Sequence, residues 1–207
     1  MLQVNVFAPN RLAVWAMKNN IKRFVYASTG GVYGSSDHAC ELNDIIINSE
    51  LGYYPDTKIA AENLLVNFSS EFEALVILRP FFIYGEGQDE SMIIPRLISS
   101  VKSGNKVTLN GNAGIKINPI YVTDAAKALL NISSLNGRNV VNIAGNEVVS
   151  LRDLLYLIGQ TVGEEPNITV KDVKQNNLIA DNSIMKNKLA NPKVDLKSGI
   201  NKVVRSL

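Results

Sequence analysis

Two short apolar stretches, separated by a helical stretch, constrain the fold more than any other feature of the sequence. Residues 22–27 and 74–78 are nearly continuous in apolar character, which is typical of strands buried on both faces of a sheet. Between them, residues 54–72 carry apolar side chains at helical spacing, with Pro55 tolerated in the first turn. This alternation of buried strand and helix predicts an α/β fold with a parallel, doubly wound sheet.

The remaining elements predict a second, smaller lobe after residue 80. Residues 4–20 form a helix that leads into the first strand, and residues 35–52 form a long surface loop. Later helices are expected at 94–103, 123–132, 151–163, 181–189 and 196–204, and strands at 106–109 and 139–143. Asp124 is expected to cap or anchor its helix. We therefore divide the chain into a main-sheet part, residues 1–80, and a mainly separate lobe, residues 81–207, with some segments returning to the main sheet.

Charge and composition limit the partners of the chain. Its 21 basic and 19 acidic residues are mixed along the sequence and give a net charge of +2, so we expect neither nucleic acid nor a membrane as partner. No apolar run approaches the ~18 residues of a membrane span, and no signal peptide is recognisable. One cysteine, Cys40, suits a reducing compartment, so we expect a cytoplasmic protein. The single histidine, His38, has no metal-ligand neighbours, and we predict no metal site.

Tyr54 and Lys58 stand four residues apart at the start of the predicted helix, so their side chains lie on one face. An ammonium beside a phenol favours the phenolate, which can exchange protons with a substrate alcohol. The spacing alone also fits an amphipathic helix with an incidental tyrosine and lysine. About twenty-five residues earlier, however, the first strand ends in hydroxyls and glycines, A-S-T-G-G-V-Y-G at residues 27–34.

Together with Y-Y-P-D-T-K-I-A-A-E at residues 53–62, this stretch resembles the extended short-chain dehydrogenase/reductases, specifically the NAD-dependent epimerase/dehydratase family that includes UDP-glucose 4-epimerases. Four later stretches follow the family in order: L-R-P-F-F-I-Y-G-E-G-Q, I-N-P-I-Y-V-T-D-A-A-K-A-L, I-A-D-N-S-I-M-K-N-K-L and P-K-V-D-L-K-S-G-I. The resemblance covers nearly the whole chain. It implies part of a Rossmann-like sheet followed by a smaller C-terminal α/β substrate lobe.

The resemblance assigns three catalytic roles. Thr29 would bond the substrate alcohol, Tyr54 would be the acid/base, and Lys58 would hold the nicotinamide ribose and acidify the phenol. The implied cofactor is NAD, with NADP as the alternative. Two further cofactor contacts leave alternatives open: Asn5 equally fits a helix cap, and Pro80 with Phe81 could touch the nicotinamide or belong to the core.

The implied reaction is the epimerisation of a nucleotide sugar. Hydride would move between a sugar carbon and NAD while Tyr54 takes or returns the hydroxyl proton. Dehydratases of the family carry an Asp-Glu pair directly after the hydroxyl residue. This chain has Gly30 and Gly31 there, which disfavours dehydration.

Substrate contacts depart from the family in two places. Phe82 stands where many sugar-nucleotide enzymes carry an asparagine that meets the diphosphate, and Ile117 stands where they carry an arginine. Lys116, beside Ile117, could meet a phosphate instead. A second arginine of the family falls near Lys171 or Lys174, and either lysine could replace it. The alternative for each of these lysines is a solvated surface residue. The expected substrate-binding set is therefore Thr29, Phe82, Lys116 and Lys171, with Lys174 as the alternative to Lys171.

No glycine precedes Gly30, although the family opens with a glycine-rich turn that holds the cofactor pyrophosphate. We therefore expect either a truncated epimerase or a chain that works with a partner supplying the missing units. The departures above keep an extended reductase for another alcohol or ketone as an alternative. A third possibility is a non-catalytic interaction module, because the family forms homodimers through the helices matching residues 6–20 and 54–72.

Overall fold

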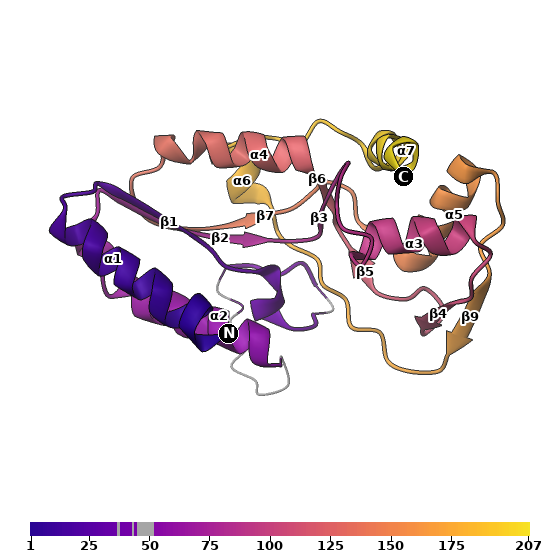
Figure 1. The fold of residues 1–207 in the computed structure, drawn as a ribbon, viewed down its shortest axis with the longest axis horizontal. Coiled ribbons are helices and arrows are strands. Elements are labelled where there is room, and N and C mark those ends of the chain that lie inside the picture. The colour runs from indigo at the N-terminus through magenta and orange to yellow at the C-terminus, as the bar shows by residue number, and fades with distance from the viewer. Residues whose placement is uncertain (37, 43, 45–51) are drawn as a thin grey trace.

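The main sheet is parallel and carries helices on both faces, as the sequence predicts. The computed structural model describes residues 1–36, 38–42, 44 and 52–207. The sheet contains β1 (Arg23–Ala27), β2 (Ala74–Pro80) and β7 (Gly137–Ile143), in the order β1-β2-β7. Helices α1 (Ala8–Lys18) and α2 (Tyr53–Val66) cover one face, and α4 (Val122–Leu130) and α6 (Ser183–Lys188) cover the other (Figure 1). The α/β doubly wound architecture is therefore confirmed.

The two predicted strands differ in burial. Every residue of β2 from Ala74 to Arg79 is buried, because the strand lies between two neighbours and under helices on both faces. The prediction that the first strand is also buried on both faces is wrong. β1 pairs only with β2 among the described residues, and Val25 is 45% exposed. An apolar sequence shows that a strand suits a parallel sheet, but not whether it lies at the edge.

The helices near the sheet begin and end close to their predicted positions, with one exception. A π-helical turn, η1 (Gln3–Phe7), leads into α1, which ends where Asn19 and Asn20 leave the helix. Helix α2 ends at Val66 and not near residue 72. The amide of Asn67 donates to the oxygens of Asn63 (3.2 Å) and Leu64 (3.3 Å), and a short 3₁₀ turn, η4 (Ser69–Glu71), follows. This side-chain bonding competes with continuation of the helix.

The second lobe packs three helices around its own core. These are α3 (Ile93–Lys102), α5 (Leu151–Val162) and α7 (Leu196–Ser206). Their caps follow the sequence: Ser150 accepts from the Asp153 N–H, and Gly163 adopts a left-handed conformation at the end of α5. Three two-stranded pairs complete the lobe and its junction with the main sheet: β3 (Ile83–Tyr84) with β6 (Ile120–Tyr121), β4 (Val107–Asn110) with β9 (Ile168–Lys171), and β5 (Lys116–Ile117) with β8 (Val149–Ser150).

Asp124 anchors a distant segment to the main-sheet side of the junction. Its buried Oδ2 atom accepts hydrogen bonds from the N–H groups of Lys193 (2.9 Å) and Val194 (2.8 Å). The carboxylate therefore holds the connection between α6 and α7 against the start of α4.

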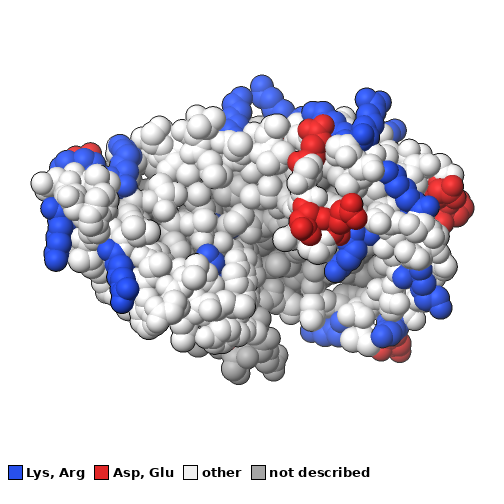
Figure 2. Space-filling model, viewed as in Figure 1, with Lys and Arg blue, Asp and Glu red and all other residues white. Residues whose placement is uncertain are grey.

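The surface charges are mixed. Figure 2 shows Lys and Arg spread around the rim of one face, with acidic residues among them on the right. Within the described residues, no helix is long and apolar enough to cross a membrane, and no group of three His, Cys, Asp or Glu side chains is arranged to hold a metal ion.

Candidate functional site

Tyr54 and Lys58 lie on one face of the first turns of α2, at the carboxyl end of β1. The Lys58 ammonium donates a 2.8 Å hydrogen bond to the main-chain oxygen of Ala27. It also lies 5.0 Å from the centre of the Tyr26 ring and 5.8 Å from the centre of the Tyr54 ring. Tyr54 is 45% exposed, so its phenol is accessible from outside.

Lys58 carries a charge in a partly desolvated position. Burial disfavours the ammonium and lowers the pKa of Lys58, while the nearby carboxylate of Glu62 opposes that shift. Glu62 follows Lys58 by one helical turn. The charge state of the lysine therefore depends on both its depth and this carboxylate.

Thr29 lies two residues after the end of β1 and caps a 3₁₀ turn, η2 (Gly30–Tyr33). Its Oγ1 atom accepts a 3.1 Å hydrogen bond from the Gly31 N–H. A methyl group at Gly31 would lie 3.5 Å from both Pro55 and the Thr29 hydroxyl oxygen, so the turn lies against the start of α2. The structure thus places Thr29, Tyr54 and Lys58 at the same edge of the sheet.

Asn5 connects η1 to the helix that carries Tyr54. Its side-chain amide donates to Thr57 Oγ1 (3.0 Å), and the Thr57 hydroxyl donates to the main-chain oxygen of Tyr54 (2.7 Å). The main-chain oxygen of Asn5 accepts from the Tyr26 hydroxyl (3.1 Å). The helix-cap alternative for Asn5 is wrong, because the residue lies inside η1 and its amide is bonded to Thr57.

The segment after β2 packs beneath the Thr29 turn. The N–H of Phe81 donates to the oxygen of Ile143 (2.9 Å), and its buried ring packs against Gly30 and Tyr33. Of the two alternatives for Phe81, contact with the nicotinamide or packing in the core, the position of its side chain fits core packing. Pro80, before it, ends β2. Phe82 is half-buried and has a φ of 39°, a conformation that few residues other than glycine and asparagine adopt readily.

The candidate phosphate-binding lysines lie on the second lobe. Lys116 is exposed on β5, whereas Ile117 beside it is fully buried, as expected for successive residues of a strand. Lys171 ends β9, and both Lys171 and Lys174 are exposed. Within the part of the chain that the structure describes, none of these three ammonium groups forms a hydrogen bond or ion pair.

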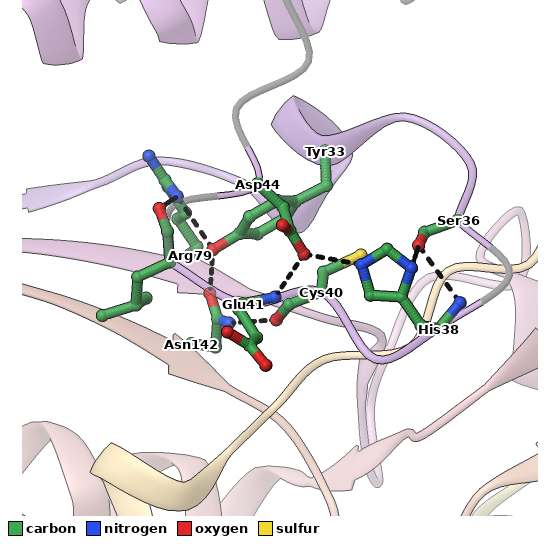
Figure 3. Close-up of polar contacts among 9 residues, drawn as sticks. Tyr33, Ser36, His38, Cys40, Glu41, Asp44, Arg79 and Asn142 are labelled. Carbon is green, nitrogen blue, oxygen red and sulfur yellow. Dashed lines mark hydrogen bonds and ion pairs between the residues drawn. The ribbon is translucent and has the colours of Figure 1, made fainter.

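A buried polar network behind the site was not predicted. Arg79 on β2 forms two contacts with Glu62 on α2, Nη2 to Oε2 at 2.6 Å and Nε to Oε1 at 3.2 Å. Its Nη1 donates to the Tyr33 hydroxyl (2.8 Å), which donates to Asn142 Oδ1 (2.8 Å), as Figure 3 shows in part. The Asn142 amide donates to the main-chain oxygens of Cys40 (3.1 Å) and Asp181 (3.0 Å). The signal in the sequence was a lone arginine ending an apolar strand.

The described part of the loop after η2 is tied down by side chains. His38 is largely exposed, as expected, and its ring nitrogens contact Asp44 Oδ2 (2.9 Å) and Ser36 Oγ (3.1 Å) (Figure 3). The Glu41 N–H and His38 together hold the pKa of Asp44 below its usual value. Cys40 is fully buried and not a loop residue on the surface. Residues 37, 43 and 45–51 of the predicted loop lie outside the described residues.

The sequence matches the model of one protein family and is similar to several longer proteins. Residues 1–144 match the model of the NAD dependent epimerase/dehydratase family. An uncharacterized UDP-glucose epimerase of Bacillus subtilis, YtcB, is 31% identical over 204 residues, which cover 95% of this chain and 64% of the relative. The dTDP-D-glucose 4,6-dehydratase of Homo sapiens is 29% identical over 168 residues, covering 78% of this chain and 47% of that enzyme. The chain thus spans about half to two thirds of these relatives.

Solved structures share the fold over nearly the full chain. MoeE5 in complex with UDP-glucuronic acid and NAD matches with a TM-score of 0.86 and 27% identity, over 99% of this chain and 71% of that one. The UDP-glucose 4-epimerase of Thermus thermophilus, in complex with NAD, matches with a TM-score of 0.81 and 23% identity, over 98% and 69%. The second likeness is one of fold alone.

Proposed function

This chain belongs to the NAD-dependent epimerase/dehydratase family, and we propose that it carries the acid/base part of an NAD-dependent nucleotide-sugar epimerase. The observation that carries the proposal is the arrangement of Thr29, Tyr54 and Lys58 at the carboxyl end of β1, with the Lys58 ammonium bonded to Ala27. The edge at the carboxyl ends of parallel strands is where such folds bind their ligands.

Each of the three side chains has a distinct task in the proposed reaction. Thr29 holds the reacting hydroxyl of the sugar, and the exposed Tyr54 phenol takes the proton from that hydroxyl and later returns it. The positive charge of Lys58 is placed to stabilise the phenol oxygen while Tyr54 lacks its proton. NAD, when bound, supplies the hydride acceptor and donor at the sugar carbon.

Packing at Gly30 supports epimerisation over dehydration. A Cβ atom at this position would lie only 2.6 Å from the ring of Phe81, which is buried and cannot easily move. The pair of acidic residues expected of a dehydratase therefore has no room at its first position.

The nicotinamide end of NAD fits the described residues better than the phosphate end. Lys58 uses one N–H on Ala27 and can direct others at a ribose, and the buried Ser28 hydroxyl at the same strand end has no partner within the described residues. In contrast, none of the first 29 residues is a glycine, so no turn there lets backbone N–H groups approach a pyrophosphate. We therefore propose that these 207 residues bind NAD weakly by themselves.

Two measurements test the proposal. Equilibrium dialysis with NAD compares the 207-residue chain with a fusion that supplies a glycine-rich dinucleotide-binding unit before residue 1; we expect firm binding by the fusion only. Epimerisation of UDP-glucose and UDP-galactose is then measured on the fusion. Tyr54→Phe should lower kcat by about 100- to 10,000-fold. Tyr53→Phe, at the exposed neighbouring tyrosine, is the matched control and should retain activity. Full activity of Tyr54→Phe would contradict the assigned role.

A reductase for another alcohol or ketone is the second candidate. It is favoured by the apolar residues Phe82 and Ile117 at positions where a nucleotide-sugar enzyme would use polar groups. Screening the fusion against UDP-sugars, dTDP-sugars and simple ketones with NAD and NADP separates the two candidates. Turnover of ketones alone would favour the reductase, and turnover of a nucleotide sugar the epimerase.

We also propose that two copies associate through α1 and α2, in the cytoplasm. Leu12 and Trp15 on α1 and Leu64 on α2 are 57%, 58% and 45% exposed, and α1 and α2 contact one another, so an interface that covers both helices would bury these apolar side chains. Size-exclusion chromatography with light scattering should give a dimer that Trp15→Lys converts to a monomer. A dimer without NAD binding, even in the fusion, would instead support a non-catalytic interaction module.

A further inference from the structure

Arg79 joins the two segments that carry the proposed catalytic residues. Through Glu62 it is bonded to α2, which bears Tyr54 and Lys58. Through the Tyr33 hydroxyl it is bonded to η2, the turn that Thr29 caps. One guanidinium therefore bonds both sides of the site, and its planar fork is suited to this because its donors point in several fixed directions.

Fold stability alone is a poor explanation for this pair. Arg79 and Glu62 are only 3% and 6% exposed, so both charges are desolvated. Desolvation of a buried ion pair commonly offsets the attraction between its charges, and apolar residues of similar shape are often equally stable. Burial disfavours the charged guanidinium, but the bonds to Glu62 and Tyr33 outweigh burial and raise the pKa of Arg79. The guanidinium of Arg79 therefore stays charged directly behind the site, and it is paired there with the carboxylate of Glu62.

Building on the proposed function, we propose that Glu62 and Arg79 are positioning residues for the acid/base site. Glu62 keeps a negative charge one helical turn from Lys58, and Arg79 holds the Thr29 turn against α2. The two tasks are separable, because the first depends on the charge of Glu62 and the second on the bond between Arg79 and Tyr33.

The first task is tested by titrating Lys58 in the chain without cofactor, with NMR of isotope-labelled lysine side chains. Because Glu62 opposes the effect of burial, Glu62→Gln should lower the pKa of Lys58 further. Leu65→Ala, which removes a fully buried side chain from the same helix, is the matched control. It should reduce the stability of the fold and leave the pKa of Lys58 unchanged.

The second task is tested by hydrogen exchange of the Gly31 N–H, which donates to Thr29. Tyr33→Phe and Arg79→Lys should each speed this exchange about tenfold. Each removes a buried hydrogen bond, and the loss of one such bond raises the equilibrium constant for local opening of the turn by up to about tenfold. Tyr26→Phe removes a hydroxyl that bonds Asn5 instead, and should leave Gly31 exchange unchanged.

The first task would be overturned by a pKa of Lys58 that Glu62→Gln leaves unchanged, or by one that Leu65→Ala shifts by the same amount. Gly31 exchange that responds to Tyr26→Phe as strongly as to Tyr33→Phe would overturn the second task. Neither measurement requires bound NAD, so a failure of NAD binding would count against the proposed function and leave the positioning roles standing.

Discussion

The Lys58 ammonium donates a 2.8 Å hydrogen bond to the main-chain oxygen of Ala27, and so joins α2 to the carboxyl end of β1. This bond holds the side chain in a partly buried position, and burial lowers the pKa of the lysine. The same contact therefore fixes the position of a functional group and keeps it in a setting that disfavours its charge.

The pH dependence of stability should reveal the lowered pKa of Lys58 in the folded chain. A lysine whose pKa is lowered by folding binds fewer protons in the folded chain than in the unfolded one. Its contribution to the free energy of unfolding therefore rises with pH, up to the ordinary lysine pKa of about 10.4, and is lost again as pH falls through the lowered value. Urea denaturation of wild type and Lys58→Met from about pH 7 to about pH 10.5 should show a difference, wild type minus variant, that increases with pH. A level or falling difference would contradict the assigned shift.

Adjacent glycines in the Thr29 turn should differ sharply in their tolerance of alanine. A methyl group at Gly30 would overlap the buried Phe81 ring, whereas at Gly31 its nearest neighbour lies at an ordinary 3.5 Å. Gly30→Ala should cost ~1–3 kcal/mol of stability through overpacking. Gly31→Ala should remain within about 1 kcal/mol of wild type. Thermal denaturation measures both, and equal losses would show that Phe81 does not set the limit.

Asp124 should be required to hold the segment before α7. Asp124→Ala leaves the N–H groups of Lys193 and Val194 without their acceptor, and should cost ~1 kcal/mol for each lost hydrogen bond because both donors are only partly buried. Asp124→Asn keeps one oxygen acceptor and should lose less. Urea denaturation gives the total effect, and faster hydrogen exchange at these two amides would locate it. A loss from alanine no greater than that from asparagine would exclude the anchoring role.

The main sheet was accessible to sequence reasoning because its strands and helices have different periodicities. The buried run that forms β2 and the caps around α5 are local signals, and both appear in the structure as predicted. The exposure of β1 was missed, because a strand's own residues do not reveal its place in the sheet order. Strand β9 was missed because it is short and pairs with β4, about 60 residues earlier.

The candidate site was partly accessible for the same reason. Tyr54 and Lys58 are four residues apart, so a helix is enough to bring them together. The pairing of Glu62 with Arg79 depends on how α2 packs on β2, and the bond from Asn5 to Thr57 spans 52 positions. Contacts of this kind depend on the packing of elements against one another, which no local pattern records.

Cys40 should be chemically inert in the folded chain. It is fully buried, its N–H donates to the oxygen of Ile179 (2.7 Å), and its own oxygen accepts from Asp181 and Asn142. Burial, followed by the charge of Asp44, raises the pKa of the Cys40 thiol to about 11, so at pH 8 only about one thousandth is the reactive thiolate.

Labelling with iodoacetamide at about pH 8, followed by mass spectrometry, should therefore be slow in the folded chain and fast in urea. Asn142→Ala removes one hydrogen bond to the Cys40 oxygen and should speed labelling by making local opening easier. Asn139→Ala, on the same strand but bonded only to nearby main-chain oxygens, is the matched control and should label as slowly as wild type. Labelling of the folded wild type at the rate of the urea-unfolded chain would show that this segment is open, and that the network from Arg79 through Tyr33 and Asn142 does not hold it closed.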